Sequence, residues 1–245
     1  MRFAALLVLS AGLLASGCAS TTTVDSVEYD PWEAPNRSLF RFNQAVDRAT
    51  FKPIAKAYVK VVPEPVRNGV TNFSRNLATP GSMLNNFLQG KAGNGFTELA
   101  RFFINTTIGI GGLFDVAGRT GIEPNMEDFG QTAAVWGVPP GPFVMIPFLG
   151  PRTLRDTATL PLNIMVDPLH YHDDSTVRLS LWFLRLVDVR SRLLPLEELM
   201  KDSSDPYVTM RESYLQNRDF QIYDGDPPTA DDDEFYDEFL EEEDY

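Results

Sequence analysis

A stretch of 23 residues without a charged side chain constrains this chain most. It covers residues 129–151, between Asp128 and Arg152. Its length would suit a helix that crosses a bilayer, which needs about 20 apolar residues. Four prolines forbid a continuous helix there, because proline lacks a backbone N–H and clashes with the preceding turn. These are Pro139, Pro140, Pro142 and Pro147.

The uncharged stretch has two interpretations. It is either a buried crossing loop of a soluble core, or a re-entrant element of a membrane-embedded protein in which other parts of the chain cover the irregular backbone. In the second case its bulky side chains contact the acyl chains of lipid. The candidates for membrane contact are Trp136, Pro139, Pro140, Phe143 and Phe148.

Apolar residues recur at helical spacing through most of the remaining chain. Polar residues, many of them arginines, lie on the opposite faces, so these helices are amphipathic. No sustained two-residue alternation rivals the helical pattern, and the sequence predicts an all-α protein without repeats. The clearest stripes are Leu39, Phe42, Val46 and Ala49; Val66, Val70, Phe73 and Leu77; and Leu179, Trp182, Phe183, Leu186 and Val187.

Capping residues and helix breakers set the expected ends of these helices. Asp30 is expected to cap the first helix, with a proline following it, and Ser175 to cap a later one. Asp205, also followed by proline, opens the last helix. Pro80 and Gly90 are expected to separate the helices between residues 66 and 103.

The N-terminus has the layout of a bacterial lipoprotein signal. A positive residue, Arg2, precedes an apolar segment at residues 3–14, and small residues lead to Cys18, the only cysteine. Cleavage before Cys18 would leave its thiol and amine to carry acyl chains, which together anchor a protein stably. The alternative is an ordinary secretory signal with an incidental cysteine. Because Ala19 is not acidic, we expect sorting to the outer membrane.

Negative charge is concentrated at the C-terminus. The net charge is -13, and residues 224–245 hold twelve Asp and Glu and no Lys or Arg, so the rest sums to -1. No basic cluster of the kind that binds nucleic acid is present. The acidic tail is expected to be disordered, and recruitment of a basic partner is the minority interpretation.

A second nearly uncharged segment, residues 102–116, carries three glycines. A phosphate-binding loop would need a Walker or Rossmann spacing, and neither is present. We expect a bend between two helical segments, where missing side chains let a backbone or a lipid chain approach.

Recognisable catalytic motifs are missing from the sequence. His170 and His172 are followed by two aspartates, but no further residues at metal-ligand spacing complete a site, and a polar turn is the simpler interpretation. No Gly-x-Ser-x-Gly elbow of a lipase is present. We therefore expect neither a catalytic site nor a metal site.

Several blocks, taken together in order and spacing, resemble the MlaA family of outer-membrane lipoproteins, also called VacJ. The blocks include D-P-W-E-A-P-N-R at 30–37, F-R-F-N at 40–43, R-N-G-V-T-N-F-S-R-N-L at 67–77, R-F-F-I-N-T-T-I-G-I-G-G-L-F-D-V-A at 101–117, W-G-V-P-P-G-P at 136–142, P-F-L-G-P-R-T-L-R-D at 147–156 and S-S-D-P-Y-V-T-M-R-E-S-Y at 203–214. Two features depart from the family: the acidic tail, and Ala15, three residues before the cysteine, where lipoprotein signals most often carry leucine.

This resemblance implies a ring-like set of amphipathic helices in the inner leaflet of the outer membrane, around a central amphipathic channel. It implies removal of mislocalised phospholipid from the outer leaflet and transfer to a periplasmic carrier protein, with a trimeric porin as a further partner. Such transport makes no bonds and needs no cofactor besides the covalent lipid. The alternatives are a structural porin-associated lipoprotein and, less favoured, a phospholipid hydrolase.

The chain is thus expected to comprise a signal peptide at 1–17, a lipidated tether at 18–29, a helical membrane-associated domain at 30–223 and an acidic tail at 224–245. We hypothesise that the glycine segment lines the lipid route, and that valine at either of its last two glycines impairs lipid removal while the protein still folds. The channel candidates are Phe102, Asn105, Thr106, Thr107, Gly109, Gly111 and Gly112.

Overall fold

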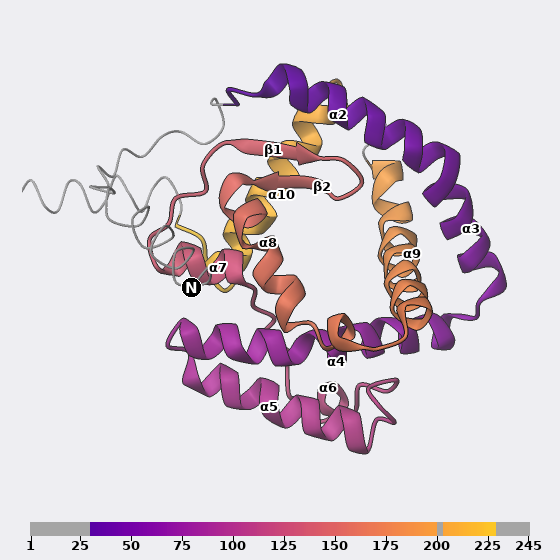
Figure 1. Cartoon of the computed structure of the whole chain (residues 1–245), viewed down its shortest axis with the longest axis vertical. Coiled ribbons are helices and arrows are strands. Elements are labelled where there is room, and N and C mark those ends of the chain that lie inside the picture. The colour runs from indigo at the N-terminus through magenta and orange to yellow at the C-terminus, as the bar shows by residue number, and fades with distance from the viewer. Residues whose placement is uncertain (1–29, 200–202, 229–245) are drawn as a thin grey trace, which may run out of the picture.

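The helices follow one another around a central opening (Figure 1). The structure, a computed structural model, describes residues 30–199 and 203–228. The expectations for Cys18, the tether and most of the acidic tail lie outside these residues. The described part is helical, as the periodicity predicts, apart from two short strands.

One side of the ring is a nearly continuous helical run. Helix α2 (Glu33–Val46) passes through a π-helical turn, η1 (Asp47–Phe51), into α3 (Lys52–Val61). The wider turn ends two residues before Pro53, whose ring crowds the preceding turn of a regular α-helix. The prediction that Asp30 caps this run was wrong: α2 begins three residues later, and Asp30 accepts from the Trp32 backbone N–H at 3.2 Å.

Helices α4 (Glu64–Leu88) and α5 (Ala92–Thr107) lie side by side (Figure 1). The prediction that Pro80 separates two helices was also wrong, since α4 continues through it. Side-chain hydrogen bonds on both sides of the proline hold the helix to its neighbours: Asn76 donates to Thr106 at 2.9 Å, and Ser82 donates to the Asn125 carbonyl at 2.8 Å. These contacts offset the backbone hydrogen bond that proline removes.

The uncharged stretch folds into a short helix and a hairpin, whose two short strands are the exception in an otherwise helical structure over the described residues. Asp128 caps α7 (Phe129–Val135), and β1 (Phe143–Ile146) pairs antiparallel with β2 (Gly150–Thr153). A four-residue apolar strand carries too little alternation to be told from a helical segment.

Two asparagines of α2, seven residues apart, bind the free edge of β1. The Asn36 amide donates to the Phe143 carbonyl and accepts from the Met145 N–H, both at 2.9 Å. The Asn43 amide does the same for Ile146 and Phe148, again at 2.9 Å. Each amide imitates the backbone of a neighbouring strand, so α2 satisfies the edge that a two-stranded sheet leaves open.

The remaining elements complete the ring. They are α6 (Val116–Arg119), α8 (Leu154–Val166), the 3-10 turn η2 (Pro168–Tyr171), α9 (Ser175–Leu199) and α10 (Pro206–Ile222). Asp205 caps α10 as predicted. For α9 the cap is Asp174, not Ser175, because the Asp174 carboxylate accepts from the N–H groups of Thr176 and Val177 at 2.7 and 3.3 Å.

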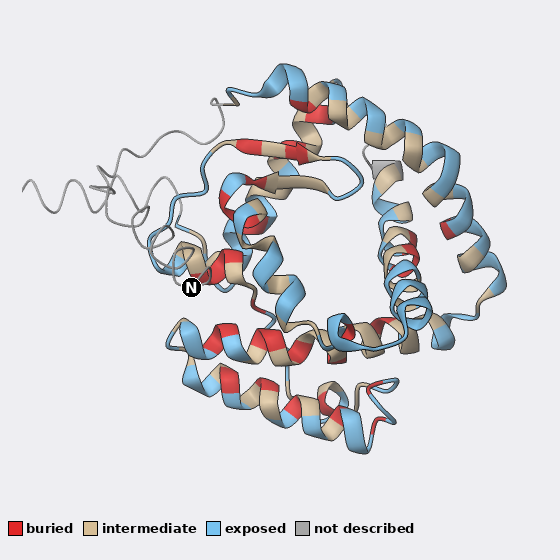
Figure 2. Cartoon of the chain, viewed as in Figure 1, coloured by how far each residue is buried: buried red, intermediate tan, exposed pale blue. Residues whose placement is uncertain are grey.

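The distribution of side chains is inverted relative to a water-soluble bundle. Within the described residues, only seven apolar side chains are buried, against twenty polar or charged ones, while 35 large apolar side chains are exposed. Buried positions gather where α4 lies along α5 and where the hairpin meets its neighbours (Figure 2). Polar contacts therefore hold much of the inside together, and apolar surface faces out.

Candidate functional site

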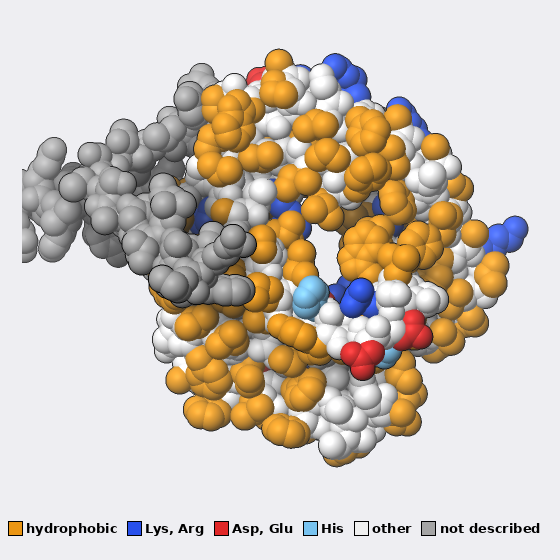
Figure 3. Space-filling view, viewed as in Figure 1, with side chains coloured by type: hydrophobic (Ala, Val, Ile, Leu, Met, Phe, Trp, Pro, Cys, Tyr) orange, Lys and Arg blue, Asp and Glu red, His pale blue; other side chains and the backbone are white. Residues whose placement is uncertain are grey.

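The central opening is the candidate site. Figure 3 shows it unfilled by side chains in this view, bordered mainly by apolar groups, with histidine, Lys and Arg side chains at its lower edge. The hairpin and α8 lie on one side of it in Figure 1, and α9 lies on the other.

The largest hollow described, of about 590 Å³, lies between α8, η2 and α9. Polar, charged and apolar side chains all line it, so the lining is amphipathic. Its volume is within the range of roughly 300–1,000 Å³ that ligand sites occupy. The lining residues are Asn163, Ile164, Asp167, Leu169, His170, Ser175, Arg178, Leu179, Trp182 and Arg185.

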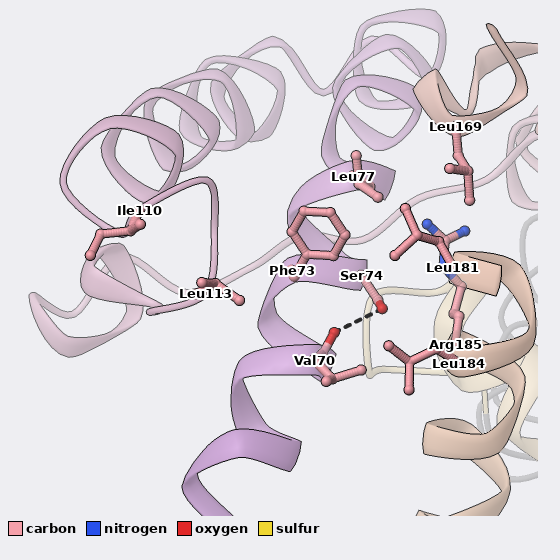
Figure 4. A pocket seen from close by; sticks show the side chains of 10 residues that line it. All are labelled: Val70, Phe73, Ser74, Leu77, Ile110, Leu113, Leu169, Leu181, Leu184 and Arg185. Atoms are coloured by element: carbon pink, nitrogen blue, oxygen red, sulfur yellow. Dashed lines mark hydrogen bonds between the residues drawn. The ribbon is translucent and has the colours of Figure 1, made fainter. Parts of the chain in front are cut away.

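A second hollow, of about 290 Å³, adjoins the first and is almost entirely apolar (Figure 4). Leu169 and Arg185 line both hollows. Leu181 and Leu184 of α9 face side chains of α4 across the space, where Ser74 supplies the polar hydroxyl. Together the two hollows put an apolar wall next to an amphipathic one.

Positive charge in the larger hollow is only partly compensated. Arg185 Nη1 donates to Asp167 Oδ2 at 2.6 Å, while its buried Nη2 has no hydrogen-bond partner among the described residues. Arg178 Nη1 donates to the carbonyl oxygens of His170 and His172 at 3.5 and 3.3 Å. Guanidinium groups in this state can bind an anionic oxygen that enters the hollow.

An ion-pair network holds the wall formed by α7, α8 and α10. Arg218 Nη2 of α10 lies 2.7 Å from Asp128 and 2.9 Å from Asp156, and the Tyr214 hydroxyl donates to Asp156 at 2.6 Å. At Gly130 a Cβ would lie only 2.2 Å from the Asp156 carboxylate, so glycine leaves room for the network. Burial opposes ionisation of both aspartates, but Arg218 keeps the pKa of each below its usual range.

The residues singled out in the glycine segment lie mostly on the far side of α4 from the opening. Helix α5 and the loop after it face away from the opening (Figure 1). The buried Asn105 amide donates to Asp115 and its oxygen accepts from the Ala117 N–H, both at 2.9 Å. From this segment Ile110 and Leu113, which were not among the channel candidates, line the smaller hollow beside α4. Whether the channel candidates of this segment contact lipid stays a prediction.

The membrane-contact candidates divide. Trp136 and Phe148 are 62% and 59% exposed, and Pro139 and Pro140 are also exposed. Phe143 is only 4% exposed and packs edge-to-face against Tyr207 in the small apolar core. Its assignment to the membrane surface was therefore wrong, because β1 turns that side chain inward.

The structure changes the expectation for the two glycines. At Gly112, with φ +90°, a Cβ would lie 2.4 Å from the Asn76 Cβ, whereas at Gly111, with φ +68°, nothing lies within 4 Å. We expect Gly112→Ala to lower the free energy of unfolding by about 2–4 kcal/mol, from overpacking and backbone strain, and Gly111→Ala by about 1 kcal/mol. Denaturant titration of both variants checks this difference, and equal midpoints would contradict it.

The histidines form a polar turn. His172 Nδ1 accepts from the Asp174 N–H at 3.2 Å, next to the start of α9. Nowhere in residues 30–199 and 203–228 do three His, Cys, Asp or Glu side chains come together as a group able to hold a metal ion. Within the same residues, no helix combines the length and hydrophobicity needed to span a bilayer.

Comparison with known proteins gives consistent matches. The model of the MlaA lipoprotein family matches residues 28–221. A protein of Escherichia coli (strain K12), named intermembrane phospholipid transport system lipoprotein MlaA, is 39% identical over 213 residues, covering 83% of this chain and 82% of its own length. A protein of the same name from Haemophilus influenzae is 31% identical over 227 residues, covering 90% of each chain.

One solved structure is also similar. It was reported under the heading "Structural basis for maintenance of bacterial outer membrane lipid asymmetry", and it aligns with a TM-score of 0.71 and 39% identity. The alignment covers 79% of this chain and 99% of the solved one.

Proposed function

The chain belongs to the MlaA lipoprotein family, and from that premise we propose that it is the lipoprotein of an intermembrane phospholipid transport system. In this role it removes mislocalised phospholipid from the outer leaflet of the outer membrane and so maintains lipid asymmetry. The transfer makes and breaks no covalent bond and uses no cofactor.

The inverted distribution of side chains carries this proposal. With 35 large apolar side chains exposed and polar residues buried, the described part suits acyl chains as surroundings better than water. The ring lies in one leaflet, held there by acyl groups on Cys18 and by its apolar surface.

The central opening is the route for the lipid. A phospholipid has a charged headgroup and two apolar tails, so it needs a polar wall beside an apolar one. The polar wall is provided by Asn163 and Asp167 with two of the α9 arginines, Arg178 and Arg185. Leucines of α4 and α9 provide the apolar wall. Arg178 and Arg185 attract the headgroup phosphate.

Two protein partners belong to this function. A soluble carrier in the periplasm takes the phospholipid from the opening, and a trimeric porin holds the lipoprotein at the outer membrane through part of the exposed apolar surface. The carrier therefore binds next to the opening, and the porin binds the apolar outer surface.

The test measures phospholipid at the cell surface. Cells that lack the protein should expose more phospholipid in the outer leaflet, and the wild-type gene should restore asymmetry. Cys18→Ala should fail to restore it because the lipid anchor is lost. Unchanged asymmetry in the deletion strain would contradict the proposal, and production of lysophospholipid by the purified protein would favour a hydrolase.

A further inference from the structure

The run α2–η1–α3 carries four exposed cations for which no carboxylate partner is found among the described residues. We call them the basic stripe: Arg41, Arg48, Lys56 and Lys60. They follow one another at intervals of seven, eight and four residues, which keeps them along one side of a helical run that contains a π-helical turn. Blue side chains protrude along the outer rim of the ring in Figure 3, where α2 and α3 lie.

Acidic residues do not neutralise this stripe. Between residues 34 and 63 the only acid is Asp47, and both of its carboxylate oxygens accept from Arg190 of α9 at 2.7 Å. The other two cations of the run are paired, Lys52 with Glu197 and Arg37 with Asp205. Glu33, the first residue of α2, also pairs with Arg37, and Glu64 lies beyond the run, at the start of α4. Charged side chains on the side of the run that faces α9 therefore form ion pairs with that helix. The exposed side of the run has an excess of positive charge.

Exposed apolar side chains accompany the stripe on the same run. Phe42, Ile54, Val59 and Val61 are exposed, the last by 76%. A helical run that exposes both apolar groups and uncompensated Lys and Arg is typical of a segment that lies in a membrane interface. There the apolar groups enter the acyl region while the long basic side chains extend to the headgroups.

We propose that the basic stripe binds the headgroups of anionic phospholipids in the leaflet that holds the ring. This proposal rests on the proposed function, since it takes the ring to lie in a leaflet, and it adds a preference for anionic lipid at a place apart from the opening. Charge complementarity supports it, because each Lys or Arg near an anionic surface adds to binding. The apolar neighbours favour lipid over an acidic protein surface, for which exposed valine and isoleucine would be poor contacts.

The test compares two double variants that each remove two exposed positive charges. Lys56→Gln/Lys60→Gln changes the stripe, and Arg75→Gln/Arg119→Gln, on α4 and α6, is the control. The full-length mature lipoprotein in neutral detergent is titrated with phosphatidylglycerol or with phosphatidylcholine. We expect the stripe variant to bind phosphatidylglycerol about tenfold more weakly than wild type, with phosphatidylcholine binding unchanged and the control close to wild type.

Added salt should weaken phosphatidylglycerol binding by the wild type more than by the stripe variant. An equal loss in stripe and control variants, or unchanged binding in the stripe variant, would overturn the proposal. Binding of both lipids without preference by the wild type would overturn it too, yet leave the proposed function standing. Binding of neither lipid would instead count against the proposed function.

Discussion

Replacing Arg218 by Met should lower the free energy of unfolding by about 3–5 kcal/mol, the range for breaking a buried ion pair from one side. Arg218 is buried and contacts Asp128 and Asp156 at once, from a third helix. Methionine fills much of the same volume but carries no charge. Asp128 and Asp156 then lose their shared cation and several hydrogen bonds, and their negative charges repel each other. Denaturant unfolding of the detergent-purified protein measures the loss.

The same network makes stability depend on pH. The folded-state pKa values of Asp128 and Asp156 are lowered, so these groups stabilise the fold above the usual carboxyl pKa, and the contribution disappears as pH falls through the lowered values. Wild type should therefore lose stability in acid, and Arg218→Met should show a weaker loss. Arg119→Gln, at an exposed position, should stay within about 0.5 kcal/mol of wild type. A loss below about 1 kcal/mol for Arg218→Met would contradict the role assigned to the network.

Filling the opening should abolish transport while the protein still folds. In Ser74→Trp/Leu179→Trp one indole enters each hollow, at positions that line the apolar space and the larger amphipathic one. Ser74 loses only a hydrogen bond to the Val70 carbonyl of its own helix. Cells with this variant should expose as much outer-leaflet phospholipid as cells without the protein.

A matched control separates blockage from damage. Thr50→Trp/Val61→Trp places two indoles at exposed positions on the outer run, and Thr50 likewise bonds only the carbonyl four residues before it, that of Val46. This variant should retain lipid asymmetry. If both double variants transported normally at wild-type levels of protein, lipid would not pass through the opening.

The helices were predicted well because helical periodicity depends only on residues three or four positions apart in the sequence. The amphipathic pattern identified α9, and Asp205 marked the start of α10. Failures occurred where tertiary contacts outweigh local preference. Pro80 lies inside α4 because side-chain bonds fix both flanks, and the hairpin depends on Asn36 and Asn43, about 100 residues earlier in the chain.

The site was less predictable than the helices. The glycine segment was predicted to line the lipid route because it is nearly uncharged, yet most of it lies on the side of α4 that faces away from the opening (Figure 1). The smaller hollow lies between α4 and the later segments η2 and α9, about 100 residues further along the chain, and no sequence spacing reveals that they meet. Trp182 was recognised on the apolar stripe of α9, but nothing in the sequence distinguished a helix that borders a hollow from one that faces solvent.

Photo-crosslinking from the opening tests the central claim most directly. A photoreactive amino acid at Trp182, which lines the larger hollow, should capture intact phospholipid in cells, and the adduct should disappear when Ser74→Trp/Leu179→Trp blocks the route. The same group at Phe103, exposed on α5 beyond α4, reports ordinary contact with membrane lipid. Adducts at Phe103 with none at Trp182 would contradict passage of phospholipid through the ring.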